Sequence, residues 1–278
     1  MVRLTGSLLL LIASTAAAAE PIDVPNFSFE APPVTRDAEN PFGALPWIDD
    51  WDETAIGPDD EMDQNTGVFL NTGPLDPTYI ANAHLDRLAF ISSLVGNDLR
   101  QELTAAFAPG RHYRLTVGVC KSLYFAVGAD EELEIALFYF DGGVEHVVAS
   151  SFVAGSQVGS NLLLDVTTIT RVVDVNDPWA SRPIGILIRP RVDDPDDTTG
   201  EGFWDADNVR LESFPPPVGD LDGDGDVDRS DLDAFNSCVT GPEVRTLTPE
   251  CEKADLDKDG DADQSDFGLL QANLNRPG

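Results

Sequence analysis

The sequence has little positive charge, few cysteines and few histidines. It contains 17 Lys and Arg against 50 Asp and Glu, for a formal net charge of −33. Nucleic-acid binding needs a basic surface that neutralises phosphates, so this charge balance argues against it. Three cysteines are too few for a disulfide scaffold. Cys238 and Cys251 are close enough in sequence to pair in an exported chain, whereas Cys120 lies in an apolar segment and is expected to be a buried thiol.

The familiar catalytic motifs are also missing. His84, His112 and His146 show no metal-ligand spacing and no H-E-x-x-H, and no G-x-S-x-G occurs. We therefore predict a non-catalytic protein. Carboxylates are plentiful, so a polysaccharide hydrolase that uses an acidic pair stays open as an alternative.

A short apolar run occurs at the N-terminus, and no later stretch is long and apolar enough to span a membrane. Arg3 precedes the run Leu8–Ala13, and four alanines at 16–19 follow. This is the pattern of a secretory signal peptide, and the run is too short to cross a bilayer as a helix. We expect residues 1–19 to be the signal peptide, Glu20 to begin the mature chain, and the protein to be secreted to the extracellular space without a membrane span.

Residues 20–213 are rich in short β-type segments. Turn signals separate these segments, including Pro109-Gly110 and Asp141-Gly142-Gly143. Many short strands with regular turns are typical of a β-sandwich, and we predict a mainly β fold of the jelly-roll kind. The predicted strands are Gly67–Leu70, Arg87–Ile91, His112–Val119, Leu133–Phe140, Val144–Phe152, Thr168–Val175, Ile184–Arg191 and Phe203–Leu211.

Residues 214–219 contain three consecutive prolines. Such a run favours a stiff, extended spacer and does not join a sheet interior. We place a linker there, followed by a small module at 220–278.

This module contains an internal repeat. Residues 220–231 and 255–266 have their aspartates and one glycine in register, with the spacing of a twelve-residue calcium loop. In such a loop the first, third, fifth and twelfth side chains bind the ion, and the sixth residue makes a sharp turn that suits glycine. The predicted side-chain ligands are Asp220, Asp222, Asp224 and Asp231 in the first loop, and Asp255, Asp257, Asp259 and Asp266 in the second.

Two further aspartates in each loop complete the predicted coordination. Asp226 and Asp261 would bind through their carbonyl oxygens, and Asp228 and Asp263 through water. We predict two Ca²⁺ ions. Without them the clustered carboxylates repel one another, so we expect the module to fold only when calcium binds.

The repeat resembles the type I dockerin family, since each loop is closed by Asp and followed by one apolar helical pattern. The resemblance covers about residues 220–275. It implies docking onto a cohesin-like or other extracellular protein, with Arg229-Ser230 and Gln264-Ser265 helping recognition. The chain departs from the family where Asn236-Ser237 and Gln271-Ala272 replace the usual basic pairs.

The β-rich region resembles the galactose-binding-like sandwich of many carbohydrate-binding modules. The resemblance rests on the segments 25–30 and 203–211 and on Leu45-Pro46-Trp47. It implies a third, structural calcium ion near Glu30 and Asp207, and binding of polysaccharide.

Exposed aromatic side chains would bind sugar rings by stacking. Trp51 and Trp179 are the predicted stacking residues, because both lie in loop-like contexts, and Tyr79 is a weaker candidate. Trp47 and Trp204 lie in strand motifs and are expected in the core. The alternative is a structural or adhesive protein that binds no sugar.

Overall fold

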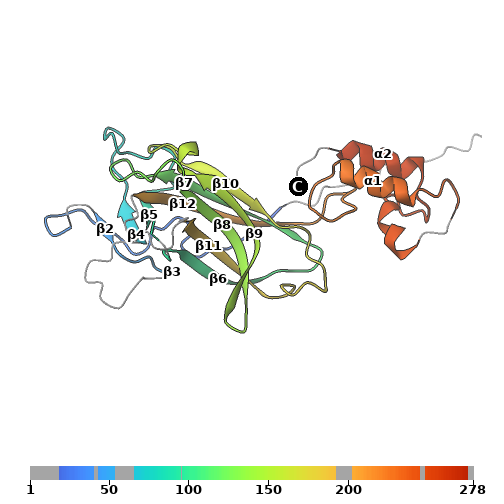
Figure 1. Cartoon of the computed structure of the whole chain (residues 1–278), viewed down its shortest axis with the longest axis horizontal. Coiled ribbons are helices and arrows are strands. Elements are labelled where there is room, and N and C mark those ends of the chain that lie inside the picture. Colours follow the sequence, from blue (N-terminus) through green and yellow to red (C-terminus); the bar gives the residue numbers. More distant parts are fainter. Residues whose placement is uncertain are drawn as a thin grey trace, which may run out of the picture.

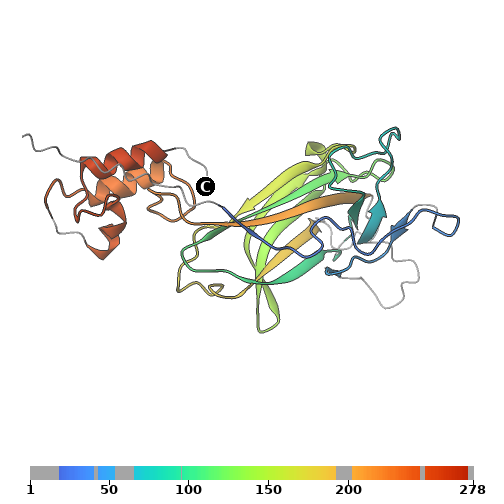
Figure 2. The same ribbon diagram turned by 180° about the vertical axis from the view of Figure 1, so that it is seen from behind.

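The computed structural model describes residues 19–40, 43–53, 66–94, 96–191, 202–244 and 248–274. It shows a β-rich domain followed by a small helical module (Figures 1 and 2). Of the predicted signal peptide only residue 19 falls within the described part of the chain, so that prediction lies outside it. Within the described residues, no helix is both long and apolar enough to cross a membrane.

The β-rich domain is built from two antiparallel sheets. The first has the strand order β10-β7-β12-β5-β4-β2, with β1 beside β12, and the second has the order β3-β6-β11-β8-β9. The first sheet contains β1 (Glu20–Ile22), β2 (Ala44–Leu45), β4 (Thr66–Leu70), β5 (Arg87–Ser92), β7 (His112–Lys121), β10 (Leu164–Ile169) and β12 (Phe203–Phe214). The second contains β3 (Asp52–Glu53), β6 (Leu99–Ala106), β8 (Glu132–Asp141), β9 (Val144–Ala154) and β11 (Pro183–Arg191), and the short helix η1 (Gly155–Gln157) follows β9.

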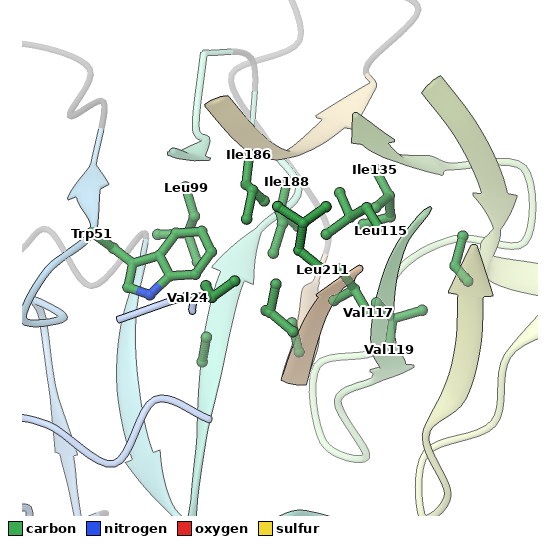
Figure 3. Packing of buried hydrophobic residues seen from close by; sticks show 14 of the residues in the cluster. Val24, Trp51, Leu99, Leu115, Val117, Val119, Ile135, Ile186, Ile188 and Leu211 are labelled. Carbon is green, nitrogen blue, oxygen red and sulfur yellow. The ribbon is translucent and has the colours of Figure 1, made fainter. Parts of the chain in front are cut away.

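The main core lies between the two sheets (Figure 3). Strand alternation supplies it: Ile135 on β8 faces inward, and Ala136, its neighbour along the strand, faces the opposite side. Leu115 from the first sheet and Ile186 from the second both lie in this core and are fully buried. Each such side chain contributes about 1.5–3 kcal/mol through burial. The core therefore holds the two sheets together.

The outer face of the first sheet is also covered in part. Leu88 and Cys120 on that face pack with Ile80 and Leu163, which come from two loops. Asn82 ties these loops together, because its side chain accepts a hydrogen bond from the Leu163 amide at 2.7 Å and donates one to the Leu163 carbonyl at 3.0 Å. The loops therefore form a second layer over this sheet.

The predicted strands agree with the structure apart from one displacement and several omissions. The predicted strand Thr168–Val175 is displaced, because β10 spans Leu164–Ile169 and residues 170–175 belong to no strand. β6 was not predicted, since its sequence LRQELTAA contains mostly helix-favouring residues and gains its strand form from pairing with β11. The short strands β1, β2 and β3 were not predicted either.

The C-terminal module contains α1 (Arg229–Cys238), η2 (Pro249–Ala254) and α2 (Gln264–Asn273). Both α-helices begin with an Asp cap, Asp228 or Asp263, whose side chain accepts a hydrogen bond from the helix backbone. Their facing sides enclose a small core that includes Phe235 and Leu270. Cys238 and Cys251 form a disulfide that joins the end of α1 to η2, and Cys120 is free and buried, as predicted.

Candidate active site and calcium loops

A cavity of about 400 Å³ opens on the outer face of the first sheet. The sheet supplies its floor, and loops before β5 and between β7 and β8 supply its walls. The lining is mainly aromatic and aliphatic, with one buried carboxyl group. It is formed by Arg36, Ala44, Phe69, Leu70, Thr72, Asp76, Thr78, Ile80, Phe90, Ser122, Leu123, Tyr124, Phe125, Ser160, Phe203 and Asp205.

The alternation of β12 decides which side chains reach this cavity. Trp204 and Ala206 point into the main core, so Phe203 and Asp205 point to the outer face. Phe90 on β5 lies directly opposite Asp205 in the ladder. The rings of Phe90 and Phe203 meet edge to face, with centroids 5.8 Å apart. An aromatic wall thus stands beside the carboxyl group.

Among the carboxyl groups that line this cavity, Asp205 has the most strongly shifted pKa. Its side chain is 6% exposed, and burial raises its pKa to about 8. No described residue donates a hydrogen bond to it or pairs with its charge. The protonated form therefore dominates at neutral pH, and its proton is available to a molecule in the cavity.

Asp207 lies two residues further along the same face and is engaged differently. Its carboxylate accepts hydrogen bonds from the backbone N–H groups of His84, at 2.5 Å, and Asn208, at 2.6 Å. Burial raises its pKa to about 7, and the charge of Glu30 adds to this. Asp207 thus holds the loop at residue 84 against the sheet.

Glu30 already has donors for both of its carboxylate oxygens. It accepts from the backbone amides of Asp86 and Arg87, each at 2.9 Å, and forms an ion pair with Arg87 at 2.6 Å. In the described part of the chain, clusters of three or more candidate metal ligands occur in the C-terminal module only. A calcium ion at Glu30 and Asp207 therefore stays a prediction.

The tryptophans are placed differently from the prediction. Trp51 and Trp179 are only 6% and 5% exposed, so neither presents a ring face to a sugar, and the prediction that they stack on glycan is wrong. The Trp51 indole N–H donates to the Asn26 carbonyl at 3.3 Å, and Trp179 packs edge-on against Phe107. Trp204 is buried as expected, whereas Trp47, expected in the core, is exposed.

Carboxylates within each predicted calcium loop lie close together. Four triads of aspartates each bring carboxylate oxygens within 4.8 Å of one another: Asp220, Asp222 and Asp231; Asp226, Asp228 and Asp231; Asp255, Asp257 and Asp259; and Asp261, Asp263 and Asp266. Among the predicted ligands of the two loops, Asp224 falls outside these triads, and Asp266 groups with Asp261 and Asp263 instead of with Asp255, Asp257 and Asp259.

The local geometry and electrostatics of the loops fit calcium. Gly225 and Gly260, the sixth residues, have φ of +104° and +101°, the sharp turn that the loop requires. Burial, then the charges of neighbouring aspartates, raise the pKa of Asp220 to about 6 despite hydrogen bonds from Gly223 and Gly225. A cation removes this repulsion, and carboxylate oxygens are the donors that calcium prefers.

Comparisons with known proteins agree with this division of the chain. Residues 20–212 match the HpiC1-like family, described as HpiC1 cyclase, and residues 218–275 match the dockerin type I domain. The first match spans more than half of the sequence, so the chain belongs to the HpiC1-like family. Among curated proteins, no sequence matches it.

Solved structures of cyclases share the fold of the β-rich domain. A cyclase from Fischerella sp. TAU is 21% identical with a TM-score of 0.52, over 71% of this chain and 98% of that one. The Stig cyclase FisC from the same organism, in complex with (3Z)-3-(1-methyl-2-pyrrolidinylidene)-3H-indole, is 21% identical with a TM-score of 0.51, over 71% and 99%. A Fischerella sp. TAU cyclase in complex with 4-(1H-indol-3-yl)butan-2-one is 22% identical with a TM-score of 0.51, over 71% and 98%.

These matches confirm one prediction and overturn another. The dockerin resemblance is confirmed; such a domain implies calcium binding and a cohesin-type protein partner. The prediction of a non-catalytic protein is wrong, because cyclases are enzymes and residues 20–212 belong to a cyclase family. The galactose-binding-like description is not confirmed, since xylan-binding modules are only distant structural neighbours, for example with a TM-score of 0.37.

Asp205 is not among the site residues that the sequence predicts, because a lone Asp is neither a nucleophile motif nor part of a carboxylate pair. A lone Asp in the aromatic strand sequence Phe203-Trp204-Asp205 was the available signal. Ionisable side chains inside an apolar strand are costly to bury and are often retained for chemistry.

Proposed function

We propose that residues 20–212 form a cyclase domain that closes a ring in an apolar, π-rich substrate, with Asp205 as the proton donor. The observation that carries this proposal is the carboxyl group of Asp205 beside an aromatic wall in a cavity of about 400 Å³; burial raises its pKa to about 8, and within the described residues no ion pair or hydrogen bond offsets this. A general acid works best when its pKa lies near the working pH.

The chemistry needs no co-reactant. Asp205 donates its proton to a double bond or heteroatom of the substrate, which leaves a carboxylate and a cationic substrate. An internal π-bond attacks the cationic carbon and closes the ring, and loss of a proton to Asp205 restores the acid. Product and substrate are isomers, and the carboxyl group ends as it began.

The aromatic residues stabilise the charge that develops. The faces of Phe90 and Phe203 attract a cation, an interaction worth about 0.5–2 kcal/mol depending on desolvation. Their apolar surface also excludes water, which would otherwise trap the cation by forming an alcohol.

The cavity favours a flat aromatic substrate of modest size. Its volume of about 400 Å³ suits one small molecule. Structural neighbours that share the fold are solved with indole compounds, so an indole bearing an unsaturated chain is the proposed substrate class. Thr78 and Asp76 also line the cavity, and the Thr78 hydroxyl donates a hydrogen bond to the Asp76 carboxylate at 2.7 Å. The oriented Asp76 carboxylate offers a hydrogen-bond acceptor to the substrate.

The remaining parts of the chain complete the proposal. The module binds two calcium ions and docks onto a cohesin-type partner outside the cell, with Arg229-Ser230 and Gln264-Ser265 at the contact. Residues 1–19 direct export. The pairing of β1 with β12, the first and last strands, supports a jelly-roll description of the domain.

The test uses the full chain in calcium. A panel of indoles with alkenyl side chains is incubated with wild type, Asp205→Asn and Asp165→Asn, and products of unchanged mass but new retention time are followed. Asp165 is an exposed control that pairs with Arg210 on the surface. We expect ring closure by wild type and the control and at least about a hundredfold loss in Asp205→Asn. Equal rates for Asp205→Asn and wild type would remove Asp205 from the mechanism.

Binding is measured separately by calorimetry with 4-(1H-indol-3-yl)butan-2-one. Asp205→Asn should still bind this probe, because the aromatic wall is intact. Absence of binding to wild type would contradict the proposed indole class.

A further inference from the structure

We propose that the first calcium loop is also an intramolecular latch: calcium bound at residues 220–231 fixes the helical module against the end of the cyclase domain.

A backbone hydrogen bond connects the two parts of the chain. The Val172 amide, in the segment after β10, donates to the carbonyl of Gly223 at 2.9 Å. Gly223 is the fourth residue of the first calcium loop, between the ligands Asp222 and Asp224. The next amide, that of Val173, donates instead to Arg111 within the cyclase domain at 2.8 Å. The Val172 amide therefore reports on the contact between the module and the cyclase domain, and the Val173 amide reports on the cyclase domain alone.

The same loop covers a buried ring of the cyclase domain. A Cβ atom added to Gly225 would lie 2.7 Å from Nδ1 of His112, so the backbone of the loop rests directly on that ring. His112 begins β7 and is only 1% exposed. The His112 ring also meets that of Phe214, the last residue of β12, with centroids 5.3 Å apart. The loop thus closes the end of the first sheet.

The linker makes two contacts just before this loop. The amide of Asp220, the first calcium ligand, donates to the Pro217 carbonyl at 3.1 Å. A Cβ atom added to Gly219 would lie 2.9 Å from the side chain of Leu270 on α2. The predicted spacer is therefore packed against the module, and β12 runs toward it in Figure 1.

Calcium controls the latch because Gly223 and Gly225, the two residues that contact the cyclase domain, lie between the calcium ligands of the first loop. Without the ion, the clustered carboxylates repel one another and the loop loses its turn at Gly225. The carbonyl of Gly223 and the backbone of Gly225 then leave Val172 and His112. By linkage, the contact also strengthens calcium binding at the first loop.

Amide hydrogen exchange of the full chain, resolved by NMR, tests the latch. With saturating calcium we expect both the Val172 and Val173 amides to be protected. Chelator should accelerate exchange at Val172 by at least about tenfold, with Val173 changing less than about twofold. Equal exchange at Val172 with and without calcium would refute the latch. Parallel deprotection of Val173 would also refute it, because the effect would then be a global loss of stability.

Matched glycine variants distinguish the loss of the contact with the cyclase domain from a general effect on calcium binding. Gly225→Ala and Gly260→Ala place a Cβ at equivalent loop positions with similar positive φ, and the contact with His112 involves Gly225. At calcium concentrations that saturate both variants, Gly225→Ala should deprotect Val172 by at least about tenfold and Gly260→Ala by less than about twofold. Equal effects of the two variants would contradict the latch.

Discussion

Replacing Asp205 by Asn should change how the stability of the cyclase domain depends on pH. The folded chain keeps the proton of Asp205 up to about pH 8, whereas the unfolded chain releases it near the ordinary value of 3.8. The folded state therefore binds one more proton between these values. Stability is fully present below the unfolded pKa and is lost as the pH rises through the folded pKa.

The magnitude follows from this one proton. One extra bound proton in the folded state changes the free energy of unfolding by about 1.4 kcal/mol per pH unit. Asp205 alone should therefore lower the free energy of unfolding by about 2.7 kcal/mol between about pH 5.5 and about pH 7.5. Asp205→Asn carries no titrating proton and should lose this contribution. Other carboxyl groups with a raised pKa, such as Asp207, contribute equally to the variant and to wild type, so their contribution cancels in the comparison.

Urea unfolding of the full chain in calcium, at both pH values, measures this difference. The change in stability with pH should be smaller in Asp205→Asn than in wild type by about 2.7 kcal/mol. Asp165→Asn, on the exposed part of β10, should behave as wild type. An identical pH dependence in Asp205→Asn and wild type would refute the buried, protonated state of Asp205 and the acid role that rests on it.

Three further predictions concern activity, calcium and packing. The rate of ring closure should fall as the pH rises through about 8, because the acid form of Asp205 is lost; a flat rate profile to pH 10 would contradict this. Chelator should abolish the helical circular dichroism signal of the module and leave the β signal, and re-addition of calcium should restore it; helix that persists in chelator would refute calcium-dependent folding. Gly185→Ala should destabilise the domain by about 1–3 kcal/mol in thermal unfolding, because its Cβ would lie 2.4 Å from the Phe138 ring, whereas Gly159→Ala, which has open space, should not.

The sequence predicts elements whose pattern is local. The hairpin at Asp141-Gly142-Gly143 is such a case: both glycines adopt positive φ, and β8 and β9 pair from Asp141 to Val144. The two calcium loops are another, since their ligand spacing is contained within twelve residues. In both, the residues that make the structure are neighbours in the chain.

The cavity could not be predicted in this way, because its parts are distant in sequence. Phe90, Tyr124 and Asp205 become neighbours only after β5 pairs with β12 and the loop after β7 folds over them. The tryptophans mislead for a related reason. Trp51 and Trp179 lie in polar, turn-rich stretches, yet tertiary packing places both in the main core.

Strand β12 carries Asp205 near one end and meets the linker at Phe214. They are nine positions apart, and at about 3.3 Å per residue this is a span of about 30 Å. β12 is paired with β7 over most of its length, with β5 at residues 203–206 and with β1 at residues 211–213. It does not bend like a flexible tether, so a protein that binds the module would be held at a nearly constant distance from the cavity. Under the proposed function, an enzyme bound to the same partner protein would receive the product at an effective concentration set by this fixed distance and not by the length distribution of a linker.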